Sequence, residues 1–433
     1  MNIIRYPARS QWQAITQRPR MDASRLYATV RELLNDVRSE GDAAVKRYEK
    51  KFDGADLSSL AVSADEFDEA ELSVGDDLKE AITLAHNNIA TFHMAEKFGG
   101  IRVETMPGVT CWQKSVPIEK VGLYIPGGTA PLFSTVLMLA TPARIAGCKD
   151  IALCTPPDKQ GRVNAAILVA ARIAGVSRVY KAGGVQAIGA LAYGTETIPR
   201  VYKIFGPGNQ YVMAAKQQVS VEGVAIDMPA GPSEVCVVAD ASANAAFVAA
   251  DLLSQAEHGI DSQVMMITTS EPMVKMITDE LERQLSLLTR KDIVSKALDN
   301  SKVVVVRDEQ EAIDLANAYA PEHLILQTAS CDQLARKVVN AGSVFIGRYA
   351  CESAGDYASG TNHTLPTHGY AVAYNGVNID SYCRKITFQQ LSPEGVRGIG
   401  PAVEKMARAE GLDAHANAMT LRLNEITDKR RKQ

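Results

Sequence analysis

The residues best suited to chemistry in this chain are a glutamine and a histidine that close one predicted helix. Apolar residues recur at helical spacing from Ala245 to His258, and Gly259 marks the end of the pattern. Gln255 and His258 are three residues apart, so both side chains leave the same face of the last turn. An amide oxygen and an imidazole on one face can supply half of a metal site. The alternative is that His258 caps the helix C-terminus, where a cation interacts favourably with the helix dipole.

Two further residues complete a candidate ligand set. Asp356 lies in a glycine-flanked loop, and His415 lies in the segment 412–417. Together with Gln255 and His258 they would offer two oxygen and two nitrogen ligands, a set that suits Zn²⁺. The four residues are far apart in the sequence, so spacing alone does not establish the site.

An acid and a base stand side by side before a predicted strand, at Glu322 and His323. Near neutral pH an imidazole can take a proton from an alcohol, and a carboxylate can activate a water molecule. Taken alone, the pair is explained slightly better as a polar loop between a helix and a strand.

Glycine-rich turns follow several predicted strands, at 126–128, 183–184 and 206–208. Turns of this kind, placed before a helix N-terminus, bind phosphate groups. No complete GxGxxG motif occurs, because Tyr211 stands where the third glycine after Gly206 and Gly208 would be. The turns alone do not decide between a dinucleotide and a mononucleotide.

The elements that must position these residues form a long alternation of strands and helices. One series of predicted strands comprises 121–125, 151–154, 178–180 and 203–205, and a second comprises 234–239, 264–268, 303–306, 323–326 and 343–346. Helical patterns separate the strands, which predicts parallel sheets covered on both faces, with ligands beyond the C-terminal strand ends. Helices are predicted before residue 97, and a hairpin is predicted around Pro107-Gly108.

We therefore expect an α/β fold with two doubly wound, incomplete Rossmann-like α/β lobes, plus small N-terminal and helical C-terminal segments. The expected parts are an N-terminal arm of residues 1–22, a lobe of residues 23–120 plus 234–378 that carries the metal and acid–base residues, an inserted lobe of residues 121–233, and a helical C-terminal part of residues 379–433.

The bulk composition excludes several classes of protein. The chain has 433 residues, 46% of them hydrophobic and 22% charged, which suits two or more domains with large cores. A net charge of −4 gives no electrostatic footprint for nucleic acid or an anionic membrane. We expect no membrane span and no secretory signal, because no apolar run is long enough. Seven cysteines without CxxC spacing predict reduced thiols in the cytoplasm.

Several long motifs resemble those of the histidinol dehydrogenase family, in the same order and nearly from end to end. They are VGLYIPGGTAPLFSTVLMLATPARIAGC (121–148), IFGPGNQYV (204–212), IDMPAGPSEV (226–235), DLLSQAEHG (251–259), APEHL (320–324), ESAGDYASGTNHTLPT (352–367) and AHANAMTLR (414–422). The resemblance implies a zinc-dependent homodimer that oxidises L-histidinol to L-histidine through L-histidinal, using two NAD⁺. These are the last two steps of histidine biosynthesis.

The resemblance also implies roles for single residues. The zinc ligands would be Gln255, His258 and Asp356, with His415 of the partner subunit as the fourth, and Glu322 and His323 would be the catalytic acid–base pair. The substrate would contact Ser233, Gln255, His258, Glu322, His323, Asp356, His363, Glu410 and His415, with Glu410 also supplied by the partner subunit. NAD⁺ would contact Tyr124, Gln186 and Asn209 in the inserted lobe, and the C-terminal part would cross the dimer. One position departs from the family pattern, because Cys351 stands where proline is expected beside Glu352.

This chemistry leaves one step to decide. His323 would take the hydroxyl proton of histidinol, whose imidazole and amine are good zinc ligands. The aldehyde must then be hydrated or captured by a thiol before the second oxidation. Cys148 and Cys154 are the thiols nearest a strand end, but their apolar neighbours suit packing. We therefore predict hydration, with Glu322 activating the water.

Three alternatives stay open. A paralogue could oxidise another primary alcohol, although Ser233, Glu410 and His415 would hold the amine and imidazole of histidinol. A zinc hydrolase would use Glu322 on a metal-bound water, would turn over without NAD⁺, and would leave the glycine turns unexplained. The adjacent acid and base argue against a metal- or nucleotide-binding protein without enzymatic activity.

Overall fold

The strands fall into three sheets in the computed structural model, which describes residues 1–18, 24–127, 131–229 and 231–431. The chain divides into two units, one of Met1–Glu96 with Ile118–Tyr382 and one of Lys97–Pro117 with Cys383–Gln433. Residues 19–22 of the expected N-terminal arm and residue 128 of the first expected glycine turn lie outside the described residues.

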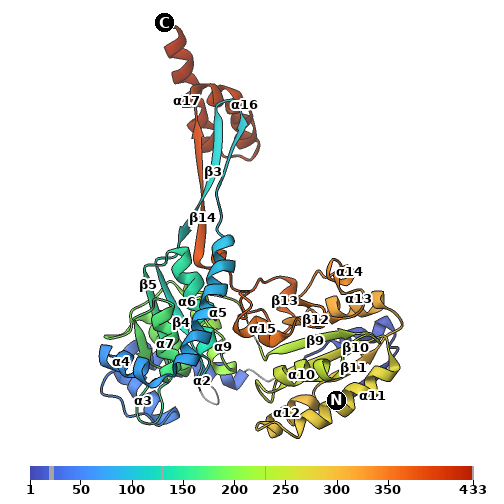
Figure 1. Ribbon diagram of the computed structural model, residues 1–433. Helices are drawn as coiled ribbons and strands as arrows, with labels where there is room; N and C mark the ends of the chain where they lie inside the picture. Colours follow the sequence, from blue (N-terminus) through green and yellow to red (C-terminus); the bar gives the residue numbers. More distant parts are fainter. Residues whose placement is uncertain (19–23, 128–130, 230, 432–433) are drawn as a thin grey trace. The chain divides into compact units, whose positions relative to one another are not determined.

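The first unit contains a five-stranded parallel sheet in the order β6-β5-β4-β7-β8. Its strands are β4 (Lys120–Tyr124), β5 (Asp150–Thr155), β6 (Val179–Lys181), β7 (Lys203–Phe205) and β8 (Ala225–Ile226). One face is covered by α4 (Ala64–Ser73), α5 (Asp76–Ala95), α6 (Phe133–Ala146) and α7 (Ala165–Ile173), and the other by α2 (Ser24–Glu40), α3 (Asp42–Phe52), α8 (Gly184–Tyr193) and α9 (Gln210–Val221) (Figure 1).

The apolar strands explain this double cover. Ile151 and Leu153 point into the core on one face, whereas Ala152 and Cys154 point into the core on the other. Successive strand residues face opposite sides, so a continuous apolar strand needs helices on both.

The first unit also contains a six-stranded parallel sheet in the order β1-β11-β10-β9-β12-β13. Its strands are β1 (Asn2–Arg5), β9 (Glu234–Ala239), β10 (Gln263–Thr268), β11 (Lys302–Val305), β12 (His323–Gln327) and β13 (Ser343–Ile346). One face packs on α10 (Ala245–Ala256), α11 (Glu271–Leu285) and α12 (Lys291–Asp299), and the other on α1 (Trp12–Ile15), α13 (Glu309–Tyr319) and α14 (Cys331–Ala335). The short helix α15 (Glu352–Tyr357) packs against α10.

The second unit is a three-stranded antiparallel sheet with two helices. The sheet runs β14-β3-β2, with β2 (Ile101–Met106), β3 (Val109–Pro117) and β14 (Cys383–Leu391), and α16 (Pro393–Ala409) packs on α17 (Asp413–Arg431). Gly108 adopts a φ of +79° in the β2–β3 turn, which confirms the predicted hairpin. Trp112 on β3 stacks on Phe388 of β14 with ring centroids 5.3 Å apart, a cross-strand pair that stabilises the sheet.

The two doubly wound α/β lobes are confirmed, but three segments lie elsewhere than the sequence analysis placed them. Residues 23–120 were grouped with the six-stranded lobe, whereas α2–α5 cover the five-stranded sheet and β2–β3 belong to the second unit. The N-terminal arm contributes β1, which pairs in parallel with β11. The C-terminal part, expected to be helical, begins with the nine-residue strand β14. Each of these placements depends on a distant partner, which a local pattern does not reveal.

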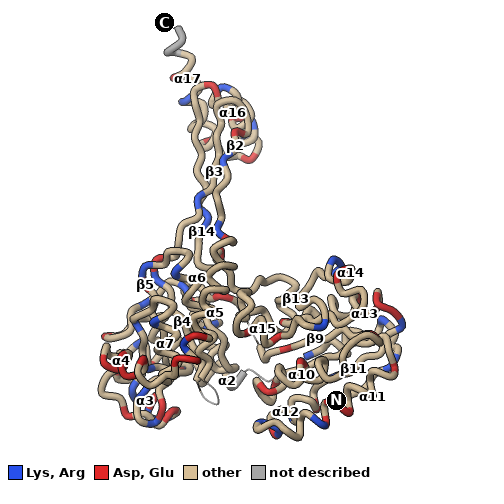
Figure 2. The backbone as a smooth tube through the Cα atoms, in the orientation of Figure 1, with Lys and Arg blue, Asp and Glu red and all other residues tan. Residues whose placement is uncertain are grey.

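Both units of the chain contain residues of both charges. Lys and Arg residues and Asp and Glu residues occur on both units in Figure 2. Among the described helices, none combines the length and the apolar character needed to cross a membrane.

Candidate active site

The candidate active site lies where two neighbouring strands of the six-stranded sheet begin. Glu234 is the first residue of β9 and His323 is the first residue of β12. His323 is in register with Val235, so the two strands start side by side. This is the N-terminal edge of the sheet, whereas the sequence analysis expected ligands at C-terminal strand ends. That expectation does not hold for this pair, because Glu322 immediately precedes β12 and His323 is its first residue.

The acid and the base of the site are both buried and both held by one residue. The N–H of Glu234 donates to Glu322 Oε2 at 2.8 Å, and the carbonyl oxygen of Glu234 lies 3.3 Å from His323 Nδ1. Glu322 is 6% exposed and His323 is 3% exposed. Burial raises the pKa of Glu322 to about 8. Burial alone would lower the pKa of His323, but the carboxylates that face it, Glu322 foremost, outweigh burial and raise that pKa to about 10.

Three side chains next to this pair could hold a metal ion. His258, Glu352 and Asp356 each place a ligand atom within 4.8 Å of the others. Glu352 and Asp356 are one turn apart on α15, and His258 follows α10. Helix α10 ends at Ala256, so His258 lies two residues beyond the helix that was predicted to contain it, and Asp356 lies on a helix rather than in a loop.

Gln255 connects the pair to the metal-binding group. It is 1% exposed on the last turn of α10. With its amide nitrogen facing the neighbouring acceptors, Gln255 Nε2 donates to Glu352 Oε1 at 2.9 Å and to the carbonyl oxygen of Glu234 at 3.2 Å. The sequence analysis missed Glu352 as a site residue. Its spacing of four residues from Asp356 was the available signal, because residues four apart share a helix face.

Two more predicted substrate contacts lie at the same place in the first unit. His363 Nδ1 lies 2.9 Å from the carbonyl oxygen of Asp356, and His363 Nε2 lies 3.2 Å from Thr135 Oγ1 on α6. Ser233 immediately precedes β9, is half-buried, and accepts the N–H of Gln263 at its carbonyl oxygen. His363 therefore touches both the metal-binding helix α15 and the five-stranded lobe.

The last two predicted contacts belong to the second unit. Glu410 is the C-cap of α16, and His415 lies in the first turn of α17. Both are exposed there. Of the expected zinc ligands, the first unit thus groups Gln255, His258 and Asp356.

The predicted NAD⁺ contacts lie at the C-terminal strand ends of the five-stranded sheet. Tyr124 ends β4, Gln186 is on α8 after β6, and Asn209 caps α9 after β7. The Asn209 side chain is exposed and accepts two N–H groups of α9. Gly206, between β7 and Asn209, has a φ of +135°, and a Cβ there would lie 2.1 Å from the carbonyl oxygen of Tyr124. Only glycine fits this turn.

Tyr124 and Gln186 both support the turn at Gly183-Gly184 from inside the lobe. The N–H of Gly184 donates to the Tyr124 hydroxyl at 3.1 Å. Glu49 Oε1 accepts from Gln186 Nε2 at 2.7 Å and from the N–H of Gly183 at 2.8 Å. Glu49 is fully buried on α3, and burial raises its pKa to about 7. No sequence signal marked Glu49.

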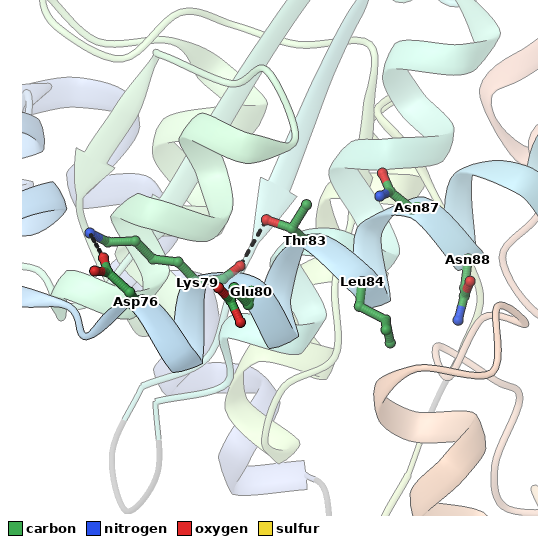
Figure 3. Close-up of a pocket in the computed structure, with 7 residues that line it drawn as sticks. All are labelled: Asp76, Lys79, Glu80, Thr83, Leu84, Asn87 and Asn88. Carbon is green, nitrogen blue, oxygen red and sulfur yellow. Dashed lines mark hydrogen bonds and ion pairs between the residues drawn. The ribbon is translucent and has the colours of Figure 1, made fainter.

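Two buried cysteines, one cysteine beside Glu352 and a surface hollow remain to be placed. Cys148 and Cys154 are buried, and burial raises the pKa of the Cys154 thiol. Cys351 is the half-buried N-cap of α15, with an extended backbone. A hollow of about 630 Å³ runs along α5 and contains no candidate site residue (Figure 3). It is lined by Asp76, Lys79, Glu80, Thr83, Leu84, Asn87 and Asn88.

Comparison with known proteins shows the family of this chain. The sequence profile described as "Histidinol dehydrogenase" matches residues 16–423. The histidinol dehydrogenase of Bacteroides fragilis is 64% identical over 426 residues, which cover 98% of this chain and 100% of that protein. The one from Yersinia pestis is 49% identical and covers 96% of this chain and 94% of that protein. The crystal structure of the histidinol dehydrogenase from Elizabethkingia anophelis superposes with a TM-score of 0.97, at 52% identity and 99% coverage of both chains. The chain therefore belongs to the histidinol dehydrogenase family, whose members are NAD-dependent oxidoreductases.

Proposed function

We propose that this chain oxidises L-histidinol to L-histidine through L-histidinal, with Zn²⁺ and two NAD⁺, as a homodimer with shared active sites. These are the last two steps of histidine biosynthesis. The observation that carries the proposal is the buried acid–base pair Glu322–His323 next to the group of His258, Glu352 and Asp356. A dehydrogenase of an amino alcohol needs a base for the hydroxyl proton and a way to orient the amine.

The donor set fits a zinc ion. Imidazole nitrogen and carboxylate oxygen are ordinary zinc ligands. Asp356 Oδ1 is buried and lies 3.4 Å from His323 Nε2, and a carboxylate oxygen of Asp356 is within 4.8 Å of ligand atoms of His258 and Glu352. Gln255, His258 and Asp356 would hold the ion, with His415 of the partner subunit as the fourth ligand. When bound, Zn²⁺ would anchor the imidazole and the amine of histidinol.

His323 is arranged to accept the hydroxyl proton at Nε2. Its Nδ1 lies 3.3 Å from the carbonyl oxygen of Glu234 and 3.0 Å from the amide nitrogen of Gln255. The tautomer in which Nδ1 donates to Glu234 would leave Nε2 basic. Nε2 is buried and lies 3.4 Å from Asp356 Oδ1, a carboxylate that the zinc ion would engage. A cation held by Asp356 would oppose the carboxylates that raise the pKa of His323, and would bring that pKa toward the range in which the imidazole can accept a proton.

Glu322 is arranged to activate water for the second oxidation. Its carboxylate is fixed by the N–H of Glu234, and its pKa of about 8 suits a group that exchanges protons near neutral pH. The aldehyde would be hydrated, with Glu322 taking a proton from the attacking water. The alternative needs a thiolate, but burial raises the pKa of Cys154, which keeps that thiol protonated and inert.

The five-stranded lobe would bind NAD⁺, which accepts the hydride in each oxidation. Exposed Asn209 and the glycine turns stand at C-terminal strand ends, where such ligands bind in doubly wound sheets. Tyr124 and Gln186 are 4% and 1% exposed, so they would act mainly by shaping the turn that the cofactor contacts.

The partner subunit would supply Glu410 and His415. Both are exposed in the second unit, as residues that serve another subunit must be. All seven cysteines are free thiols, and we propose that the protein works in the reducing cytoplasm.

The test is NADH formation with L-histidinol, followed at about 340 nm, in protein stripped with a chelator and then given Zn²⁺. The expected yield is two NADH per histidine, lost on stripping and restored by zinc. Absence of NADH at saturating histidinol and NAD⁺ would favour the paralogue, and product formation without NAD⁺ would favour a hydrolase. Sedimentation of the Zn²⁺-loaded protein checks the dimer.

A further inference from the structure

We infer that Arg18 and Glu234 are positioning residues for the acid–base pair Glu322–His323, which makes the N-terminal segment part of the active site. The inference rests on the proposed function of that pair. It concerns residues that touch neither the substrate nor the cofactor.

Among the described residues, five hydrogen bonds, the longest of them to the carbonyl oxygen of Ala320 at 3.5 Å, and one aromatic ring fix Arg18. Its Nε donates to Glu234 Oε1 at 2.9 Å and its Nη2 to Glu234 Oε2 at 2.8 Å. Nη2 also donates to the carbonyl oxygen of Tyr319 at 2.6 Å, and Nη1 donates to that of Thr16 at 3.2 Å. The guanidinium carbon lies 3.9 Å from the centroid of the Tyr319 ring. A two-pronged bond of this kind fixes the plane of the carboxylate as well as its position.

Glu234 contacts both Arg18 and the catalytic pair, so it links the position of Arg18 to that of the pair. Its carboxylate binds Arg18 and also accepts the backbone N–H of His368 at 2.9 Å. Its backbone contacts both members of the pair. The N–H of Glu234 donates to the carboxylate of Glu322, and the carbonyl oxygen of Glu234 faces Nδ1 of His323. The two bonds come from one residue at the start of β9. A rotation of the backbone at Glu234 would therefore move the hydrogen bonds of Glu322 and His323 together.

Burial argues that this ion pair serves orientation. The Arg18 side chain is 10% exposed and that of Glu234 is 2% exposed. A buried ion pair is often no more stabilising than apolar residues of the same volume, because both charges lose hydration. Apolar residues would not reproduce the fixed geometry of the ion pair between Arg18 and Glu234. A lysine at position 18 would keep the positive charge but would lose the pair of N–H donors that binds both carboxylate oxygens.

The competing explanation is that Arg18 only anchors the N-terminal segment. In that case its loss would lower stability and the yield of folded enzyme, while the folded fraction kept its kcat. If Arg18 positions the pair, kcat falls in fully folded protein. The KM for NAD⁺ stays the same in that case, because the cofactor lobe is not involved.

The variants are Arg18→Ala, Arg18→Lys and Glu234→Gln in the full-length, zinc-loaded protein. Arg9→Met is the matched control. Arg9 is in the same segment, pairs with Asp314 at 2.5 Å and lies 5.2 Å from the centroid of the Trp12 ring, but does not touch β9. The measurements are kcat with histidinol, KM for NAD⁺, zinc content and melting temperature. Guanidinium ion is added to Arg18→Ala at a concentration that does not unfold the protein, with sodium chloride as the reference salt.

We expect kcat to fall about 100-fold in Arg18→Ala and Glu234→Gln, because misplacement of catalytic groups by about 1 Å costs that much. KM for NAD⁺ and zinc content should match the wild type, guanidinium should restore kcat at least several-fold, and Arg9→Met should match the wild type. If Arg18→Ala does not fold, the same measurements are made on Arg18→Lys, which keeps the positive charge. A folded, zinc-loaded Arg18 variant with kcat within about threefold of the wild type would overturn the inference. A wild-type enzyme without activity on histidinol would instead overturn the proposed function.

Discussion

Replacing Glu49 by glutamine should stabilise the protein at alkaline pH and leave it little changed at acid pH. Glu49 is fully buried on α3, and its Oε1 accepts from Gly183 and Gln186. A glutamine keeps that acceptor oxygen and has no proton to lose. Asp53 lies close by, and burial raises its pKa too, so ionisation of both acids adds repulsion.

The magnitude follows from the pKa of Glu49, which burial raises from 4.5 to about 7. The folded protein holds this proton up to about pH 7, whereas the unfolded chain releases it near pH 4.5. Stability from this group is thus fully present below pH 4.5, falls through the interval, and is lost above pH 7. The loss is about 3 kcal/mol, at about 1.4 kcal/mol per pH unit.

The assay compares the melting temperatures of wild type and Glu49→Gln from pH 5 to pH 8.5. The difference in favour of the variant should grow by roughly 4 °C over this range, at roughly 1.3 °C per kcal/mol for the unit of about 360 residues that contains Glu49. Glu80→Gln makes the same change at an exposed position of α5 and serves as the control. A difference that stays constant with pH, or shrinks, would show that Glu49 is hydrated and that the reasoning from burial is wrong.

Three other changes test the site and its support. Asp227→Asn leaves the buried Lys216 ammonium without its partner and should cost about 3–5 kcal/mol, measured by thermal or urea unfolding. Cys154→Ala should keep both oxidations, with the NADH yield per histidinol unchanged, whereas loss of only the second oxidation would refute aldehyde hydration. Glu352→Gln weakens the acceptor that orients the Gln255 amide and should lower zinc affinity about 10–100-fold in competition with a chelator, while unchanged affinity would exclude that role.

The sequence predicted those features that depend on residues close together in the chain. Strand β12 and the polar residues before it were visible because an apolar run follows an acid and a base. The residue types made Gln255, His258 and Asp356 candidate ligands, and only the motif resemblance assigned them to zinc. The structure places these side chains around α10 and α15. Glu352 was overlooked although its helical spacing from Asp356 was available.

Other features depend on contacts that no local pattern contains. Strand β14 pairs along its whole length with β3, with Phe388 opposite Trp112, and that partner is far away in the sequence. In the sequence, Glu49 resembles an exposed charged residue of a helix, because it is followed by two lysines. In the fold it is buried beside the turn that precedes α8. Arg18 acquires a role only because Glu234 lies beside it in the fold.

The position of the acid–base pair at an N-terminal strand edge has a physical explanation in the use of two sheets for one reaction. The glycine turns of the five-stranded sheet stand at C-terminal strand ends, where helix N-termini favour the phosphates of a dinucleotide. In the proposed function the six-stranded sheet does not bind the dinucleotide, so its strands β9 and β12 can begin at the site. There the first residues of the strands orient Glu322 and His323. The hydrogen bond between Thr135 on α6 and His363 joins the two lobes beside Asp356. In the proposed reaction, hydride transfer would need a substrate on the six-stranded lobe close to a cofactor on the five-stranded lobe, and this hydrogen bond is one of the contacts that join the two lobes.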